Sequence, residues 1–168
     1  MRIAILGRSG SGKTSYAIKL GQRLDIPVHH LDKHFYVHSW IERDKHEFLK
    51  IQQQLVAQEK WIIDGNNLTT IEVRLARADA LIIFDMPKLL CLWRVIKRAF
   101  QKNRNIDDRA PNSPEQVTWN LIKYSWNYEK RLKKLADVLE SAAKKIPVIY
   151  VRSKADIDGL VKKIEQIS

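Results

Sequence analysis

The sequence predicts an α/β protein with a parallel sheet that is covered by helices on both faces. Five short apolar runs alternate along the chain with segments of helical periodicity. Most of the runs are apolar without alternation, which is typical of parallel strands buried on both faces. Because right-handed crossovers place helices between successive parallel strands, three layers are expected. The predicted strands are Arg2–Leu6, Val28–Leu31, Trp61–Asp64, Ala80–Asp85 and Val148–Val151.

Length and cysteine content narrow the class of protein. The 168 residues fit a single domain, 1–168, that can bury a substantial core. The sequence contains no run of about 18 apolar residues, so no membrane-spanning helix and no membrane partner are expected. The single cysteine, Cys91, excludes an internal disulfide and indicates a reducing compartment, which predicts a cytoplasmic protein.

Basic residues outnumber acidic ones by 30 to 19, which gives a formal net charge of +11 at pH 7. The surplus lies mainly in residues 86–168, where 18 basic and 9 acidic residues leave a net +9. Such a charge predicts anionic partners, namely nucleotide phosphates, nucleic acid or a membrane surface. Charge alone does not distinguish among these three. A nucleotide is the expected partner, nucleic acid is possible but not favoured, and a membrane is not expected.

Helix start signals lie between the predicted strands. Ser39 and Glu42 have the spacing of a capping box, which predicts a helix from there to about Glu59. Ser153 and Asp156 have the same spacing and predict the start of the last helix.

The segment before the last strand is predicted to be one long helix. Ser113, Pro114 and Gln116 have the types expected of an N-cap, a first helical position and a capping partner. Apolar residues then recur at three- and four-residue steps as far as Ala142. The polar segment from about Lys102 to Pro114 is expected to project from the body of the protein.

The loop after the first strand carries the most specific motif. Residues 7–14, Gly-Arg-Ser-Gly-Ser-Gly-Lys-Thr, match the pattern G-x-x-x-x-G-K-[ST] in full. Glycines allow successive backbone N–H groups to point at phosphate oxygens, and the following helix adds the positive end of its dipole. Lys13 is expected to reach the β- and γ-phosphates and Thr14 to hold Mg²⁺. The motif therefore predicts an ATP·Mg²⁺ site with nucleotide contacts from Gly7, Ser9, Gly10, Ser11, Gly12, Lys13, Thr14 and Ser15.

A carboxylate near the metal is expected as well. Asp64 lies at the carboxyl end of a predicted strand, which is the edge where ligands bind in open α/β sheets. Asp64 is therefore predicted to organise Mg²⁺, directly or through its water molecules. The alternative is a turn or helix-capping role, which the Asp64-Gly65-Asn66 sequence would also suit.

Several arginines are candidates for contacts with the transferring phosphoryl group. Arg94 and Arg98 are one helical turn apart on the helix predicted from Lys88 to about Phe100. Arg104 and Arg109 follow in the projecting segment. Converging guanidinium groups stabilise the negative charge that phosphoryl transfer spreads over the equatorial oxygens.

Taken together, these segments resemble the DNA topology modulation proteins, which are related to adenylate kinases. The resemblance spans nearly the whole chain and is carried by the loop at residues 7–14, Leu31-Asp32, residues 61–66, Asp85-Met86-Pro87, residues 91–94 and Trp126-Asn127-Tyr128. It implies a P-loop nucleoside-monophosphate-kinase-like fold, with strand order 2-3-1-4-5 and a small mobile lid at about residues 99–125.

The resemblance also implies roles for individual residues. Arg94 would lie along adenine, Arg98 would contact the ATP phosphates, and Arg152 would lie in the adenine-binding loop. Arg104 and Arg109 would belong to the lid. The segments with which adenylate kinases bind AMP have no counterpart here, so the ATP site is implied more strongly than the acceptor site.

The phosphoryl acceptor remains open between two classes. If the acceptor is an alcohol, Asp32 would orient its hydroxyl or take its proton, as in the small-molecule kinases of the shikimate and gluconate type that look similar here. If the acceptor carries a phosphate, an arginine such as Arg74 becomes more useful. Asp32 also suits a turn or cap. The four histidines around it have no fixed ligand spacing, and no metal site is predicted there.

Three functions are consistent with this pattern. The favoured one is a kinase that transfers the ATP γ-phosphoryl to a nucleotide or small metabolite, with Lys13, Arg94, Arg98 and Asp32 as catalytic residues. The second is an ATP-binding regulatory protein associated with nucleic acid, suggested by the basic cluster at residues 130–134. The third is a simple NTPase. A monomer or weak homodimer is expected.

Overall fold

The computed structural model describes residues 1–99, 110–112 and 118–167. In this part of the chain five strands form one parallel sheet in the order β2-β3-β1-β4-β5. This order confirms the fold that the sequence predicts. The strands lie within one residue of their predicted ends: β1 (Arg2–Gly7), β2 (Val28–His30), β3 (Trp61–Asp64), β4 (Ala80–Phe84) and β5 (Val148–Val151).

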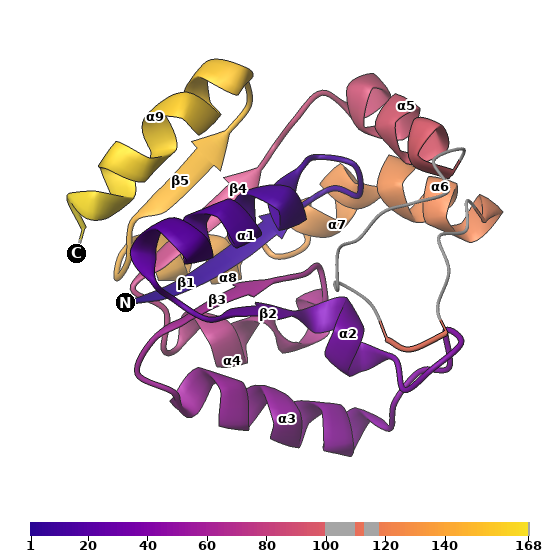
Figure 1. Ribbon diagram of the computed structural model, residues 1–168, viewed down its shortest axis with the longest axis horizontal. Coiled ribbons are helices and arrows are strands. Elements are labelled where there is room, and N and C mark those ends of the chain that lie inside the picture. Colours follow the sequence, from indigo (N-terminus) through magenta and orange to yellow (C-terminus); the bar gives the residue numbers. More distant parts are fainter. Residues whose placement is uncertain (100–109, 113–117, 168) are drawn as a thin grey trace.

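Helices cover both faces of the sheet. The side chains of β1 alternate between the two faces and so contact a different layer of helices on each. Ile3 and Ile5 pack with α1 (Lys13–Leu24) and α9 (Lys154–Glu165). Ala4 and Leu6 point to the opposite face. That face is covered by α3 (Lys45–Ala57), α4 (Ile71–Leu75) and α8 (Ala136–Ala143). Figure 1 shows α1 in front of the sheet and α8 behind it.

The remaining helices lie around the carboxyl ends of the strands. They are α2 (Leu31–Phe35), the 3₁₀ helix η1 (Leu68–Thr70), α5 (Lys88–Ala99), α6 (Trp119–Trp126) and α7 (Tyr128–Lys133). In Figure 1, α5 and α6 lie side by side near the loop that leads into α1. None of the helices in the described ranges is long and apolar enough to cross a bilayer.

The predicted start of α3 is wrong. Ser39 and Trp40 have positive φ angles of 47° and 60°, so the chain makes a tight turn where the helix was expected. The helix begins at Lys45, and the Asp44 carboxylate accepts hydrogen bonds from the N–H groups of His46 and Glu47 at 2.9 and 3.1 Å. The Ser39 N–H donates instead to the carbonyl of Pro111. A contact between distant parts of the chain therefore replaces the local capping box.

The predicted long helix is three helices, α6, α7 and α8. Asn127, with φ −90° and ψ 8°, separates α6 from α7, and Leu135, with φ −103° and ψ 13°, precedes α8. Thr118 caps α6 by accepting a hydrogen bond from Leu121 N–H. The predicted start at Ser113 to Gln116 lies outside the described residues.

The capping box of α9 is confirmed. The Ser153 hydroxyl accepts from Asp156 N–H, and the Asp156 carboxylate accepts from Ser153 N–H.

Candidate phosphate-binding site

The loop between β1 and α1 is shaped by two glycines in left-handed conformations. Gly10 has φ 81° and Gly12 has φ 94°, a region that other residues adopt only at a cost. A Cβ atom on Gly10 would lie 2.2 Å from the Cys91 carbonyl oxygen, so the loop packs directly against the start of α5. Both positions therefore require glycine for a backbone reason.

The N-terminus of α1 faces this loop. Its N-cap is Gly12, and no side chain in the described ranges caps it. The first N–H groups of a helix have no partners within the helix, and they carry the positive end of its dipole. With the preceding loop, they form the arrangement that binds phosphate in other proteins.

Lys13, Thr14 and Asp64 meet at the start of α1. The Thr14 hydroxyl donates to the Asp64 carboxylate at 2.7 Å, and Lys13 Nζ lies 3.6 Å from the same oxygen. The other oxygen of Asp64 contacts Nδ1 of His30, at the end of β2. Strands β1, β2 and β3 therefore bring four polar side chains to one point at their carboxyl ends.

Asp64 is almost entirely buried, with 2% of its surface exposed. Burial would raise the pKa of its carboxyl, but the Lys13 ammonium and the hydrogen bonds from His30 and Thr14 outweigh burial and lower the pKa. Asp64 is therefore ionised at neutral pH, and its charge lies beside the Thr14 hydroxyl. A carboxylate and a hydroxyl are oxygen ligands of the kind that Mg²⁺ prefers, so the residues present fit the predicted metal.

Asn66 holds the first residue of the loop in place, a role that the sequence did not reveal. Its side-chain oxygen accepts from Gly7 N–H at 3.0 Å, and its amide nitrogen donates to the Gly7 carbonyl. The turn that carries Asn66 is fixed by Arg74, whose guanidinium donates to the carbonyls of Gly65 and Asn67. The Asp64-Gly65-Asn66 sequence indicated a turn, but the contact with Gly7 arises only from the pairing of β1 with β3.

Arg8 is a second residue that sequence reasoning missed. Its side chain is 2% exposed, donates to the Ser125 carbonyl at 2.7 Å, and pairs with Glu129. Its guanidinium also lies 5.6 Å from the centre of the Tyr128 ring. Arg8 therefore ties the phosphate loop to the junction of α6 and α7.

The other predicted nucleotide-binding residues differ in their contacts with the loop and in their exposure. Arg94 of α5 approaches it, with Nη1 3.5 Å from the carbonyls of Gly10 and Ser11. Arg98 is half-buried one turn further along α5, and Ser15 is exposed in the first turn of α1. Ser9 lies in the loop itself, and Ser11 is buried there.

The remaining predicted residues are Arg152 and the two arginines of the predicted lid. Arg152 is exposed and follows β5, where Nε donates to Asp85 at 3.2 Å and the guanidinium lies over the Tyr150 ring. Arg152 thus borders the end of β4 and β5, at the carboxyl edge of the sheet. Arg104 and Arg109 lie outside the described residues, as does most of the predicted lid at about 99–125.

The two candidates for the acceptor end differ sharply in burial. Asp32 is exposed in the first turn of α2, immediately beyond the end of β2. Arg74 is fully buried, and burial lowers the pKa of its guanidinium to about 10. Because both terminal nitrogens of Arg74 bond to backbone carbonyls, this arginine supports the Asn66 turn.

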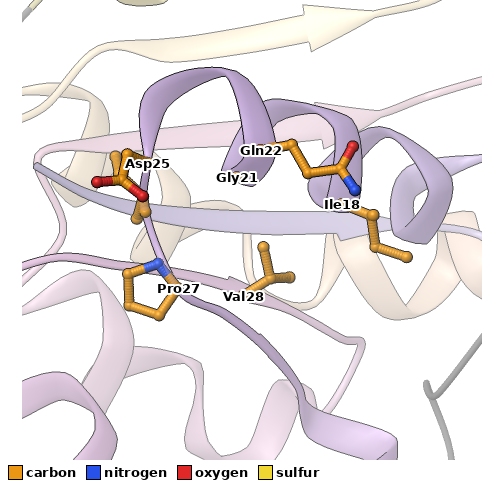
Figure 2. A pocket seen from close by; sticks show the side chains of 7 residues that line it. Ile18, Gly21, Gln22, Asp25, Pro27 and Val28 are labelled. Carbon is orange, nitrogen blue, oxygen red and sulfur yellow. The ribbon is translucent and has the colours of Figure 1, made fainter.

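A surface hollow of about 440 Å³ lies away from this site. It is bounded by the last turns of α1 and the start of β2, at the amino ends of the strands (Figure 2). None of the predicted site residues borders it. Its lining residues are Ile18, Gly21, Gln22, Asp25, Ile26, Pro27 and Val28.

A parallel sheet in this order, with a glycine loop between its first strand and first helix, is the fold of the P-loop kinases. Three solved structures with this fold align with essentially the whole chain. No protein-family model matches the sequence, and no curated protein matches it.

Shikimate kinase from Aquifex aeolicus aligns with a TM-score of 0.54 and 17% identity, over 99% of this chain and 95% of that one. Shikimate kinase from Bacteroides thetaiotaomicron gives a TM-score of 0.61 and 13% identity, over 99% and 97%. Deoxyadenosine kinase from M. mycoides, solved with the products dCMP and dCDP, gives 0.57 and 14%, over the full length of both chains. At these identities the similarity is one of fold.

Proposed function

We propose that the protein is an ATP-dependent phosphotransferase of the P-loop kinase type. The observation that carries this proposal is the meeting of Lys13, Thr14 and Asp64 at the N-terminus of α1, beside a glycine loop shaped for phosphate. One ammonium, one ionised carboxylate and the N–H groups of a helix start lie there together. The similar solved structures are kinases, which supports the same reaction class.

Each residue has a distinct part in this proposal. The loop amides and Lys13 bind the phosphate chain of ATP, and Arg94 and Arg98 stabilise the charge that develops on the transferred group. Thr14 and Asp64 hold Mg²⁺, which neutralises phosphate charge when it is bound. Arg152, beside the end of β5, contacts the nucleoside part of ATP.

Replacing Lys13 by alanine tests this assignment. Lys13→Ala should lower acceptor-dependent ATP turnover at least about 100-fold, because it removes the ammonium that stabilises the transferring phosphoryl group. Turnover is measured in a screen of nucleotides, nucleosides, sugar acids and alcohols. Lys19→Ala, an exposed position on the same helix, is the matched control and should retain the wild-type rate. Equal rates in the two variants would refute the assignment.

The same screen separates the kinase from the two other functions. A simple NTPase would hydrolyse ATP in water as fast as in the presence of any acceptor. A regulatory protein would bind ATP without comparable turnover, and its binding to nucleic acid would weaken steeply with salt. The kinase requires one acceptor that raises ATP consumption well above the rate in water.

We also infer that the chain belongs to the DNA topology modulation proteins. The segments that carry the resemblance support this inference: residues 61–66 supply Asp64 and Asn66, and residues 91–94 contact the phosphate loop. We also infer a cytoplasmic location, which the single cysteine supports; Cys91 is buried and free.

A further inference from the structure

Two consecutive residues of the phosphate loop are held by two consecutive residues of α6. Gly7 is bonded to the Asn66 side chain through both its N–H and its carbonyl, and the Asn66 carbonyl accepts from the Tyr124 hydroxyl at 3.2 Å. The Arg8 guanidinium donates to the carbonyl of Ser125, the next residue of α6, at 2.7 Å. The start of the loop and the last turn of α6 are therefore joined by two separate sets of hydrogen bonds.

The Arg8 side chain makes its contacts inside the protein. It is 2% exposed, and Nη2 pairs with the Glu129 carboxylate in the first turn of α7. The Tyr128 ring lies 5.6 Å from the guanidinium carbon, measured to the ring centre. Arg8 thus contacts α6 and α7 through both terminal nitrogens, which indicates that it supports the loop rather than binding phosphate itself.

The backbone of Arg8 begins the turn that shapes the loop. Its carbonyl accepts from Ser11 N–H at 3.0 Å, and Gly10, within this turn, packs against the Cys91 carbonyl of α5. Gly12 then forms the N-cap of α1. Because a loop that is already fixed in its binding conformation loses less entropy when it binds a ligand, a displacement of Arg8 should weaken phosphate binding.

The buried charge of Arg8 depends on Glu129. A buried guanidinium that loses its carboxylate partner is left uncompensated, which is strongly unfavourable. Arg8 would then turn toward solvent, and the turn that begins at its backbone would shift with it. The Glu129 side chain is 57% exposed, so its replacement changes the partner of Arg8 without removing a side chain from the core.

We propose that Arg8 is a positioning residue, whose ion pair with Glu129 holds the phosphate loop in its ATP-binding conformation. Arg8 itself does not contact ATP. This inference rests on the proposed function, because it concerns the same loop. It makes ATP binding depend on α6 and α7, which carry none of the nucleotide-binding residues.

Three glutamate variants test the inference by calorimetric titration with ATP and Mg²⁺. Glu129→Ala removes the carboxylate and should raise the Kd for ATP at least about 5-fold over wild type. Glu129→Gln retains an oxygen that accepts from Arg8, and its Kd should lie between those two. Glu140→Ala, at an exposed position of α8, removes the same charge and should stay within about twofold of wild type.

The direction of the effect at Glu129 separates positioning from direct binding. If Arg8 were itself a phosphate ligand, loss of Glu129 would release its guanidinium, and Glu129→Ala would bind ATP more tightly than Glu140→Ala. Tighter binding, or equal binding in these two variants, overturns the inference.

A double-mutant cycle attributes the effect to the ion pair. Arg8→Met should also raise the Kd for ATP at least about 5-fold. The double variant should bind ATP within about twofold of Arg8→Met alone, since the pair is already broken. Additive losses would overturn the inference. If Arg8→Met does not fold, the three glutamate variants still decide the outcome.

The readouts keep the two proposals separable. If the wild type binds ATP·Mg²⁺ saturably and Glu129→Ala binds it equally well, the inference fails and the proposed function stands. If the wild type does not bind ATP, both fail.

Discussion

At the scale of the residue, Gly10 shows how closely the phosphate loop packs against α5. Its φ is 81°, and a Cβ atom at this position would lie only 2.2 Å from the Cys91 carbonyl oxygen, which leaves no space for a side chain. The contact between Lys13 and Asp64 depends on this packing, because the loop determines where α1, which carries Lys13, begins. The chemistry of the site is therefore tied to backbone conformation as well as to charged groups.

Gly10→Ala should destabilise the protein by about 2–4 kcal/mol, because it combines an unfavourable φ with a backbone clash. Gly159→Ala is the matched control: a Cβ there meets no atom within 4 Å, and alanine is favoured over glycine in a helix by about 0.5–1 kcal/mol. Urea denaturation of both variants measures the difference. Equal stabilities would show that the loop does not pack against α5 as described.

At the scale of the element, the Asp44 cap decides where α3 begins. Asp44 accepts two backbone hydrogen bonds at the helix start, whereas Ser39 lies in a turn five residues earlier. The turn itself is held by the hydrogen bond that Ser39 N–H donates to the Pro111 carbonyl.

Asp44→Ala should lower the free energy of unfolding, because it removes the oxygen that accepts hydrogen bonds from His46 and Glu47 N–H at the helix start. Ser39→Ala should change it by less than about 0.5 kcal/mol, since the Ser39 backbone makes the contact with Pro111. Denaturant titration of the two variants, side by side, compares the caps. A larger effect at Ser39 would indicate that Ser39, as the sequence predicts, caps the helix in place of Asp44.

The elements differ in how far the sequence alone predicts them. The strands were predictable within one residue. Strands β1, β3, β4 and β5 are mainly apolar runs. Strand β2 reads Val-His-His, and Val28 is its one apolar residue. The start of α3 could not be predicted, because the three-residue spacing of Ser39 and Glu42 also occurs where the chain makes a turn. The breaks at Asn127 and Leu135 could not be predicted either, because the apolar periodicity continues across them.

The residues of the candidate site also differ in how far the sequence alone predicts them. The loop at residues 7–14 and Asp64 could be predicted, since a motif and the end of a strand mark them. The parts played by Asn66, His30 and Arg8 could not, because each contacts residues more than 30 positions away. Such contacts depend on strand order and helix packing rather than on local sequence.

At the scale of the whole molecule, the two ends of the sheet have different roles. The carboxyl ends gather the polar side chains of the site. At the amino ends, Asp79 joins β1 to the start of β4 by accepting from the backbone N–H of Arg2 at 2.7 Å and from its guanidinium at 2.6 Å. The hydrogen bond from Arg2 lowers the pKa of Asp79, an effect that partial burial opposes.

The stability of the molecule should depend on pH through this group. Because the folded pKa of Asp79 lies below its ordinary value of 3.8, its contribution is complete above that value and is lost as the pH falls through the folded pKa. Asp79→Asn should therefore cost about 1 kcal/mol at pH 7. The difference from wild type should shrink below about pH 4. Denaturation from pH 2.5 to 7 measures it, and a constant difference would contradict the assignment.

The central claim is that the loop at residues 7–14 and Lys13 bind the triphosphate of ATP. Calorimetric titration with ATP and Mg²⁺ tests it most directly, with wild type and Lys13→Ala compared under the same conditions. We predict saturable binding at one site in the wild type, weakened at least about 10-fold, or about 1.4 kcal/mol, in Lys13→Ala. Absence of saturable binding in the wild type, or equal affinity in the two proteins, would contradict it.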